Sequence, residues 1–128
     1  MRLLLDTHIL LWALIEPDRL KPETRSLLEN PDHEVLFSAA SVWEIAIKAA
    51  LGRADFLVSP DEIVEAARHS GFVELPVRSG AASKVASLPH HHRDPFDRLL
   101  VAQAMTEPAA LYTADAQLEA YSELVVRV

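Results

Sequence analysis

Five short apolar segments alternate with segments of helical pattern, and this alternation constrains the fold more than any other feature of the sequence. The apolar segments are residues 2–5, 34–37, 72–77, 109–112 and 124–128. Their nearly continuous apolar character is typical of parallel strands that are covered on both faces. Strands that alternate with helices in this way indicate an α/β fold. We therefore expect a central, mainly parallel sheet of four or five strands with helices on both faces.

The segments between the strands carry signals for the start of helices. We expect helices over residues 7–15, 22–30, 42–51, 60–69, 79–86, 95–106 and 116–121. Asp94 directly precedes Pro95, which is the arrangement of an N-cap residue followed by a proline at the first helical position. Ser41 and Glu44 have the spacing of a capping box. No linker and no repeat divides the chain, so residues 1–128 are expected to form a single domain.

The composition excludes several functional classes. The chain has no Cys, which excludes disulfides, cysteine zinc sites, iron–sulfur clusters and thiol nucleophiles, and a reducing, cytoplasmic location is expected. The three glycines, Gly52, Gly71 and Gly80, are too far apart for a glycine-rich phosphate-binding loop. The apolar segment 9–15 is far shorter than the roughly 20 residues that cross a bilayer, so we expect no membrane association. The net charge of -7 argues against a large basic surface for nucleic acid.

Acidic residues follow the apolar segments or open the next helix at four places. These residues are Asp6, Glu44, Asp97 and Asp115. Ligands bind beyond the carboxyl ends of parallel strands, so the four side chains are expected to converge at one edge of the sheet. Two like charges about 4 Å apart repel by roughly 4 kcal/mol near a protein surface. A Mg²⁺ or Mn²⁺ ion would relieve this repulsion, which leads to the hypothesis of metal-assisted hydrolysis of a phosphodiester.

Each of these acids also has a simpler structural interpretation, which the local sequence leaves open. A carboxylate at the start of a helix can accept hydrogen bonds from free backbone N–H groups or interact with the helix dipole. The structural alternatives are an N-cap for Asp6, Asp115 and the nearby Asp94, a dipole interaction for Asp97, and a capping box with Ser41 together with an ion pair with Lys48 for Glu44.

Other polar residues cluster just before the helix predicted over residues 95–106. The loop 90–93 consists of three histidines and an arginine and is expected to approach the site, with His92 or Arg93 in contact with phosphate. Three consecutive histidines rarely point at one ion, so the run itself is not expected to form a metal site. Arg98 follows Asp97 directly and could orient that acid or meet the substrate.

Two further interpretations are less favoured by the residues. Trp12 and Trp43 occur at helical spacing with aliphatic residues, so we expect them to pack in the core or in an interface rather than to stack on bases. Asp6 at a strand end could also be the covalent nucleophile of a phosphatase. Such hydrolases usually have a second acid two positions later, where this chain has His8.

Four strings occur in order along the chain, namely LLLDTHILLW, SAASVWEIAIK, LPHHHRDPFDRLLVAQA and LYTAD. Together they resemble the PIN-domain family, in particular the small single-domain PIN proteins similar to VapC toxins of bacterial toxin–antitoxin modules. The match extends over nearly the whole chain. The resemblance implies a three-layer α/β/α domain, a Mg²⁺ or Mn²⁺ site and endoribonuclease activity against structured RNA.

The resemblance also implies roles for particular residues and partners. The acidic positions of the family fall on Asp6, Glu44, Asp97 and Asp115. Thr113 matches a hydroxyl residue that hydrogen-bonds within the site, and Asp94 matches an acid typical of this branch. The implied partners are a second copy of the chain, in a homodimer, and a small antitoxin protein. The alternative is a non-catalytic, metal-binding regulatory or interaction protein on the same fold.

Overall fold

The computed structural model describes residues 1–128 and contains one five-stranded sheet in which all paired strands are parallel. The strands are β1 (Arg2–Leu5), β2 (Glu34–Ser38), β3 (Val73–Leu75), β4 (Ala110–Thr113) and β5 (Val125–Arg127). They lie in the order β3-β2-β1-β4-β5. Leu4 of β1 is in register with Leu36 of β2 and with Leu111 of β4, so the sheet is apolar at its centre. The predicted α/β fold with a central parallel sheet is confirmed.

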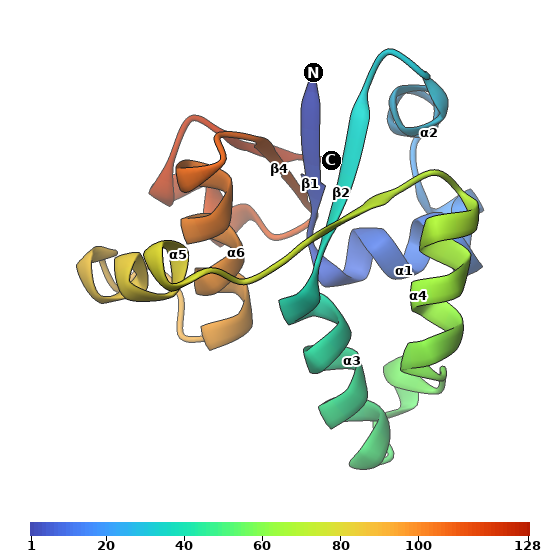
Figure 1. Cartoon of the computed structure of the whole chain (residues 1–128), viewed down its shortest axis with the longest axis horizontal. Coiled ribbons are helices and arrows are strands. Elements are labelled where there is room, and N and C mark those ends of the chain that lie inside the picture. Colours follow the sequence, from blue (N-terminus) through green and yellow to red (C-terminus); the bar gives the residue numbers. More distant parts are fainter.

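Helices connect successive strands and cover the sheet (Figure 1). The α-helices are α1 (Thr7–Ile15), α2 (Pro22–Glu29), α3 (Ala39–Ala50), α4 (Pro60–His69), α5 (Ser79–Lys84) and α6 (Pro95–Thr106). Short 3₁₀ helices occur at Pro17–Arg19, Ala54–Phe56, Val85–Ser87 and Ala116–Tyr121. None of the helices has the length and apolar character that crossing a membrane requires.

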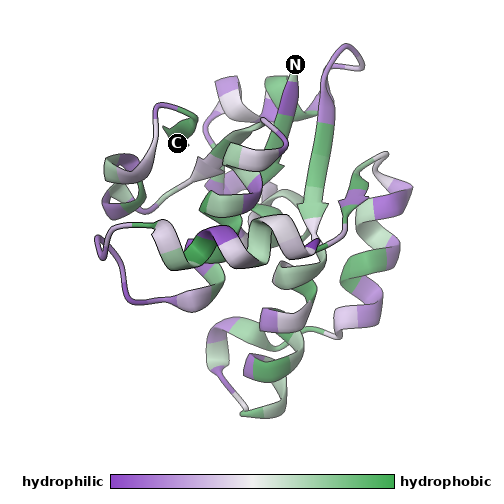
Figure 2. Ribbon diagram, turned by 60° about the vertical axis from the view of Figure 1, so that its left-hand side comes forward, coloured by the Kyte–Doolittle hydropathy of each residue, from purple (hydrophilic) through white to green (hydrophobic).

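The sheet has a separate apolar core on each face, which is what three layers require. Successive side chains of a strand point to opposite faces. Leu3 and Leu5 therefore pack with residues of α1 and α4, whereas Leu4 packs with residues of α6 and β4. Figure 2 shows the result: the visible strands are mostly hydrophobic, and the helices carry both hydrophobic and hydrophilic stretches.

The start of α3 differs from the prediction. The helix begins at Ala39, three residues before the predicted position, because the hydroxyl of Ser38 caps it by accepting a hydrogen bond from the N–H of Ala40 at 3.0 Å. Ser41 is buried inside the helix and does not form a capping box with Glu44. Glu44 consequently lies on the second turn of α3 and not on the first.

The chain order explains where a ligand site can form. From the central strand β1 the chain adds β2 and β3 on one side, and then β4 and β5 on the other. The carboxyl ends of β1, β2 and β4 therefore meet at the point where the winding reverses, and this is where open parallel sheets bind ligands. In Figure 1 this is the lower end of the strands, from which α1 and α3 start.

Candidate active site

Asp6 follows β1 directly and is 5 % exposed. One of its carboxylate oxygens, Oδ1, accepts a hydrogen bond from the N–H of Ile9 at 2.9 Å and thereby caps α1. The other, Oδ2, accepts from the hydroxyl of Thr113 at the end of β4. Burial raises the pKa of Asp6, although these two hydrogen bonds lower it. The capping role is confirmed, and it leaves the carboxylate at the edge where β1 and β4 end.

Glu44 is held by neighbours from two helices and is 2 % exposed. Its Oε1 accepts a hydrogen bond from the hydroxyl of Thr7 at 2.6 Å, and Thr7 also bonds to the hydroxyl of Ser41 at 3.0 Å. Its Oε2 lies 2.5 Å from Nζ of Lys48, the predicted partner one turn further along α3. These contacts hold the buried carboxylate of Glu44 beside Thr7, the residue that follows Asp6.

Asp94 and Asp97 open α6. The Oδ1 atom of Asp94 accepts hydrogen bonds from the N–H groups of Phe96 at 2.8 Å and Asp97 at 3.3 Å, so its predicted N-cap is confirmed. The pKa of Asp97 is raised to about 7, first by burial and then by the negative charges of Asp94, Asp6 and Glu44. The structure thus brings the acids close enough together to oppose one another's ionisation.

Asp115 lies beyond β4 and is connected to the loop before α6. Its Oδ1 accepts from the N–H of Gln117 at 2.9 Å, which caps the 3₁₀ helix Ala116–Tyr121, and its own N–H donates to the hydroxyl of Thr113 at 3.0 Å. Its Oδ2 lies 2.7 Å from Nε2 of His92. Thr113 therefore bridges Asp6 and Asp115, as predicted for a hydroxyl within the site.

The hydrogen bonds of His92 determine which of its ring nitrogens carries the proton. A backbone N–H can only donate, and the N–H of Asp94 lies 3.0 Å from Nδ1 of His92, so Nδ1 accepts. The proton is then on Nε2, which donates to Asp115. His92, Asp97 and Asp115 have ligand atoms within 4.8 Å of one another. Metal ligation by Nε2 would nevertheless require the other tautomer and would remove both hydrogen bonds, so the geometry favours His92 as a donor that orients Asp115.

The donor set fits a hard divalent cation. Carboxylate oxygens are the ligands that Mg²⁺ and Mn²⁺ prefer, and the pKa of Asp97 is raised first by burial and then by the negative charges of Asp94, Asp6 and Glu44, which a bound cation would offset. Only Lys48 forms an ion pair with one of the four predicted acids through a permanently charged side chain, and it pairs with Glu44.

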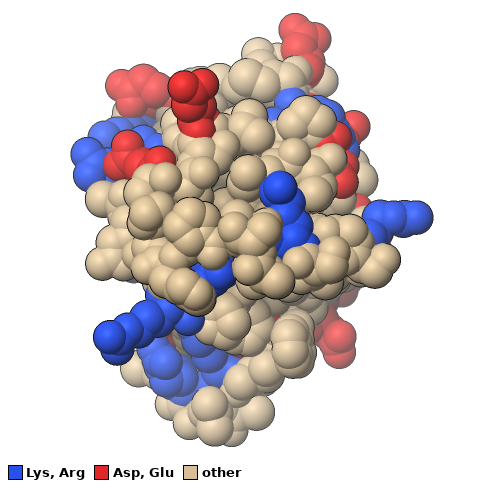
Figure 3. Space-filling view, turned by 90° about the vertical axis from the view of Figure 1, so that its left-hand side faces the viewer, with Lys and Arg blue, Asp and Glu red and all other residues tan.

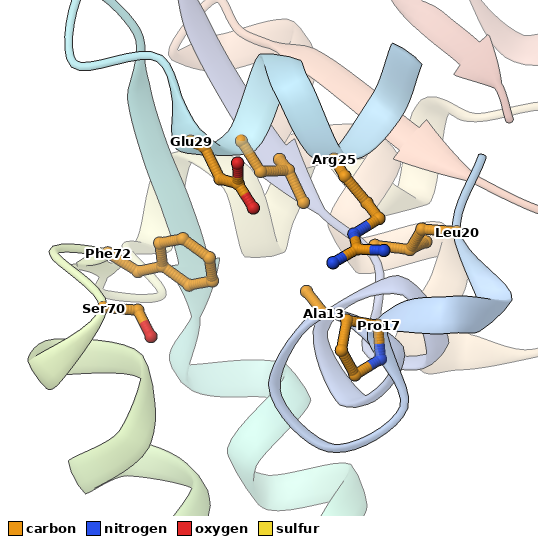
Figure 4. Close-up of a pocket in the computed structure, with 8 residues that line it drawn as sticks. Ala13, Pro17, Leu20, Arg25, Glu29, Ser70 and Phe72 are labelled. Carbon is orange, nitrogen blue, oxygen red and sulfur yellow. The ribbon is translucent and has the colours of Figure 1, made fainter. Parts of the chain in front are cut away.

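Asp6, Asp94, Asp97 and Asp115 line a cavity of about 390 Å³ together with His8, Trp12, His92 and Ala114. A different cavity of about 360 Å³ lies among α1, α2 and the residues before β3, where Figure 4 shows Arg25 and Glu29 opposite Phe72. This second cavity contains none of the predicted acids. The candidate active site is therefore the first one.

Two of the predicted basic residues do not contact the acids. Arg98 is buried, and its guanidinium donates to the carbonyl oxygens of Val85 and Leu88 at 3.0 and 3.1 Å and lies 2.9 Å from His90. Its expected role in orienting Asp97 or meeting substrate is therefore not supported, because its side chain ties the preceding loop to α6. Arg93 is exposed and makes no ion pair with the acids.

The tryptophans differ from each other in their surroundings. Trp43 on α3 is 60 % exposed, and its ring packs edge-on against Phe96 with centroids 5.3 Å apart. Trp12 is partly buried against the core and also lines the acidic cavity. The predicted core packing is therefore observed for one side of Trp12. Trp43 lies outside the core.

Two supporting residues were not found by sequence reasoning. Thr7 binds Glu44, and the hydroxyl of Tyr121 accepts a hydrogen bond from the N–H of His92 at 2.9 Å. The position of Thr7 directly after Asp6 was a usable signal, since its side chain must lie near the same strand end. Tyr121 offered no such signal, because its partner is 29 residues away in sequence.

A family model for the PIN domain matches residues 3–124. The chain therefore belongs to the PIN-domain family. Among characterised proteins, it is similar to Ribonuclease VapC22 from Mycobacterium tuberculosis (strain ATCC 25618 / H37Rv), with 30% identity over 122 residues that cover 92% of this chain and 90% of that protein.

Solved structures show the same fold. The structure of VapBC2 from Rickettsia felis bound to a DNA fragment from their promoter has a chain that matches with a TM-score of 0.72 and 13% identity, covering 100% of this chain and 98% of that one. The structure of FitAcB from Neisseria gonorrhoeae has a chain that matches with a TM-score of 0.57 and 22% identity, covering 91% of this chain and 89% of that one. A domain of a functionally unknown protein from Methanocaldococcus jannaschii matches with a TM-score of 0.62 and 15% identity, covering 99% of this chain and 90% of that one.

Proposed function

We propose that this protein is a metal-dependent endoribonuclease and the toxin component of a type II toxin–antitoxin module. The observation that carries the proposal is the cavity beyond the strand ends that Asp6, Asp97 and Asp115 line together, with the buried carboxylate of Glu44 close enough to raise the pKa of Asp97. The similarity to Ribonuclease VapC22 over nearly the whole chain supports RNA as the substrate. The proposal includes a single domain over residues 1–128 and a cytoplasmic location.

In this proposal Asp6, Glu44, Asp97 and Asp115 hold the Mg²⁺ or Mn²⁺ ion. Such an ion supplies Lewis acidity, an activated water and charge stabilisation for hydrolysis of a phosphodiester bond. The supporting side chains keep the oxygen ligands in place before the ion binds: Thr113 fixes Asp6, Thr7 and Lys48 fix Glu44, and His92 fixes Asp115. Such preorganisation reduces the ordering that binding requires.

Asp97 has a particular part in this proposal. Because its pKa is raised to about 7, its carboxyl group retains a proton for much of the time near neutral pH in the metal-free protein. Asp97 would hold a cation as the charged carboxylate and would give up that proton to do so. Asp97 therefore couples metal affinity to pH more strongly than an ordinary carboxylate would.

Basic residues near the site support contact with an RNA backbone. On the face shown in Figure 3, Lys and Arg side chains lie at the lower left and also at the centre, the right edge and the upper left, where Asp and Glu side chains lie beside some of them. Exposed Arg93, in the loop beside the acids, could contact phosphate without moving the site. A positive charge at this place allows local contact with an RNA phosphate in a protein whose net charge is -7.

We also propose two protein partners. Trp43 and the residues that follow α3 include large apolar side chains that are exposed, at 60 % for Trp43, 74 % for Leu51 and 77 % for Leu57, and such exposure supports a contact with a second copy of the chain or with an antitoxin protein. The match to a chain of VapBC2 agrees with a partner of this kind. The alternative function, metal binding and regulation without catalysis, uses the same surfaces but predicts no cleavage.

The test compares purified wild type with Asp6→Asn on structured RNA with Mg²⁺, with Mn²⁺ and with EDTA. We expect cleavage by wild type with either ion and none with EDTA or with Asp6→Asn. Asp32→Asn is the matched control, since Asp32 is an exposed acid in a turn, and it should cleave like wild type. Equal cleavage by wild type and Asp6→Asn would point to a contaminant. Metal binding without RNA fragments would favour the non-catalytic alternative.

A further inference from the structure

The acidic cavity is also lined by two aromatic side chains of α1. His8 and Trp12 are one helical turn apart and face this cavity together with the acids. Their rings lie with centroids 6.3 Å apart at an angle of 56°. The His8 side chain is 46% exposed and also packs edge-on against Phe56, with centroids 5.6 Å apart. An accessible aromatic surface thus lies directly beside the carboxylates.

A second hollow of about 190 Å³ shares the same two rings. Its lining also includes apolar side chains and the charged groups of Glu16, Arg19 and Asp55. The guanidinium of Arg19 lies 4.8 Å from the centroid of the Trp12 ring. A phosphate group placed here would face two carboxylates and one guanidinium, that of Arg19, which already lies 3.7 Å from Glu16, whereas a neutral planar group would meet aromatic and apolar surface. The lining therefore favours a nucleobase over a phosphate.

We infer that His8 and Trp12 form a subsite for the unpaired base of the nucleotide next to the phosphodiester that is cut. The inference rests on the proposed ribonuclease function. Every base has a π face, and proteins bind single-stranded RNA by stacking bases on aromatic side chains. The bases of a duplex are already stacked on one another, so this subsite selects loops, bulges and ends of a structured RNA.

Trp43 provides an internal comparison for this inference. It is 60 % exposed, whereas Trp12 is partly buried, yet it lines neither of the two hollows. If accessibility alone determined base binding, Trp43 would be the better candidate. The position of Trp12 between the acids and the second hollow is what makes it the base-binding ring. The chain contains only these two tryptophans, so each can be observed separately by fluorescence.

The experiment measures binding of a short single-stranded RNA, and of the same RNA as a duplex, in the presence of Mg²⁺. Both proteins carry Asp97→Asn to prevent cleavage; one also carries Trp43→Phe and reports on Trp12, and the other carries Trp12→Phe and reports on Trp43. We expect a saturable change in Trp12 fluorescence with single-stranded RNA, little change with the duplex, and little change in Trp43 fluorescence. His8→Ala should weaken binding about tenfold, which corresponds to loss of one stacking contact.

Controls separate a binding role from a structural one. His69→Ala removes an exposed histidine from the last turn of α4 and should leave RNA binding unchanged. Thermal unfolding confirms that His8→Ala and Trp12→Leu are folded. Equal RNA affinity of His8→Ala and its parent overturns the inference, as does a response of Trp43 alone or a response to a partner protein but not to RNA.

Cleavage by proteins with intact Asp97 distinguishes failure of the subsite from failure of the proposed function. If wild type cuts RNA but His8→Ala and Trp12→Leu cut the same positions with unchanged KM, the subsite is wrong and the nuclease remains. If wild type cuts no RNA, the proposed function is wrong, and with it the assignment of the base to a nucleotide beside a scissile bond. A raised KM and altered cut positions in both variants would support the inference.

Discussion

Two cavities of this molecule are nearly equal in volume and differ in what surrounds them. The acidic cavity measures about 390 Å³ and the cavity of Figure 4 about 360 Å³. In the first, burial and then the neighbouring carboxylates raise the pKa of Asp97 to about 7. In the second, Arg25 and Glu29 supply one charge of each sign beside apolar groups such as Leu20. The difference shows that a buried group of like-charged carboxylates identifies a ligand site better than the volume of a cavity does.

The largest expected effect is on catalysis, and it belongs to the acidic cavity alone. Asp97→Asn removes a proposed metal ligand while keeping the shape of the side chain, so we expect a loss of RNA cleavage of at least about a thousandfold. The rate of cleavage with saturating Mg²⁺ measures it. Glu29→Gln, the corresponding amide change in the other cavity, should retain activity. An equal loss in both variants would remove the distinction between the two cavities.

Packing is expected to dominate in the second cavity. Leu20 is 7% exposed and belongs to the apolar core around α1, so Leu20→Ala should lower the free energy of unfolding by about 2–4 kcal/mol. Denaturant unfolding measures this change. The folded fraction should cleave RNA at the rate of wild type, because the acids pack elsewhere. Lost cleavage by fully folded Leu20→Ala would show that the two cavities are coupled.

The acidic cavity should make the metal-free protein less stable as the pH rises. The folded protein retains the proton on Asp97 up to a pKa of about 7, whereas an unfolded chain releases it near the ordinary value of 3.8. Between these values the folded state binds more protons, so stability falls with rising pH and levels off above about pH 7.

Asp97→Asn removes this contribution. In EDTA at pH 8 we expect it to raise the free energy of unfolding by about 1–3 kcal/mol, since one pKa unit corresponds to about 1.4 kcal/mol and the cluster can relax. Unfolding of both proteins from pH 4.5 to pH 8 measures the difference. Parallel curves for the two proteins would contradict the electrostatic account. Asp32→Asn serves again as the exposed control.

The smallest effect concerns the residue that orients Asp115. His92→Leu removes the N–H donor and should weaken Mg²⁺ binding about tenfold, as loss of a group that orients a ligand usually does. His92→Gln can still donate and should recover most of the affinity. Calorimetric titration without RNA measures both variants. If His92 were itself a ligand, His92→Gln would also lower the preference for Mn²⁺ over Mg²⁺, because imidazole binds Mn²⁺ more readily.

Local sequence signals were sufficient for the strands and for the position of the acids. Asp6, Asp94 and Asp115 occupy helix starts that a single stretch of sequence defines, and each of them caps the helix that follows. Capping uses only part of the hydrogen-bonding capacity of a carboxylate. The structural and functional interpretations of these acids are therefore compatible, because one carboxylate can cap a helix and also bind a ligand.

The same signals were misleading where two candidates competed. Ser38 and Ser41 both precede a helical segment, and the capping-box spacing favoured Ser41, whereas the structure uses Ser38. Ser41 is buried inside the helix, where its hydroxyl contacts that of Thr7, so Ser38 caps the helix instead. The two possible roles of Arg98 were suggested by its sequence neighbour Asp97, but successive helical residues point in different directions, and its side chain binds the preceding loop.

The sequence by itself determined the alternation of strand and helix, the polar residues at the strand ends and the helix caps, since each depends on residues within a few positions of one another. Only the tertiary structure decided the raised pKa of Asp97, the tautomer of His92 and the contact of Thr7 with Glu44. These depend on distances between residues up to 107 positions apart, as for Thr113 and Asp6. Such distances are set by how the sheet is wound and packed, and no local pattern in the chain contains them.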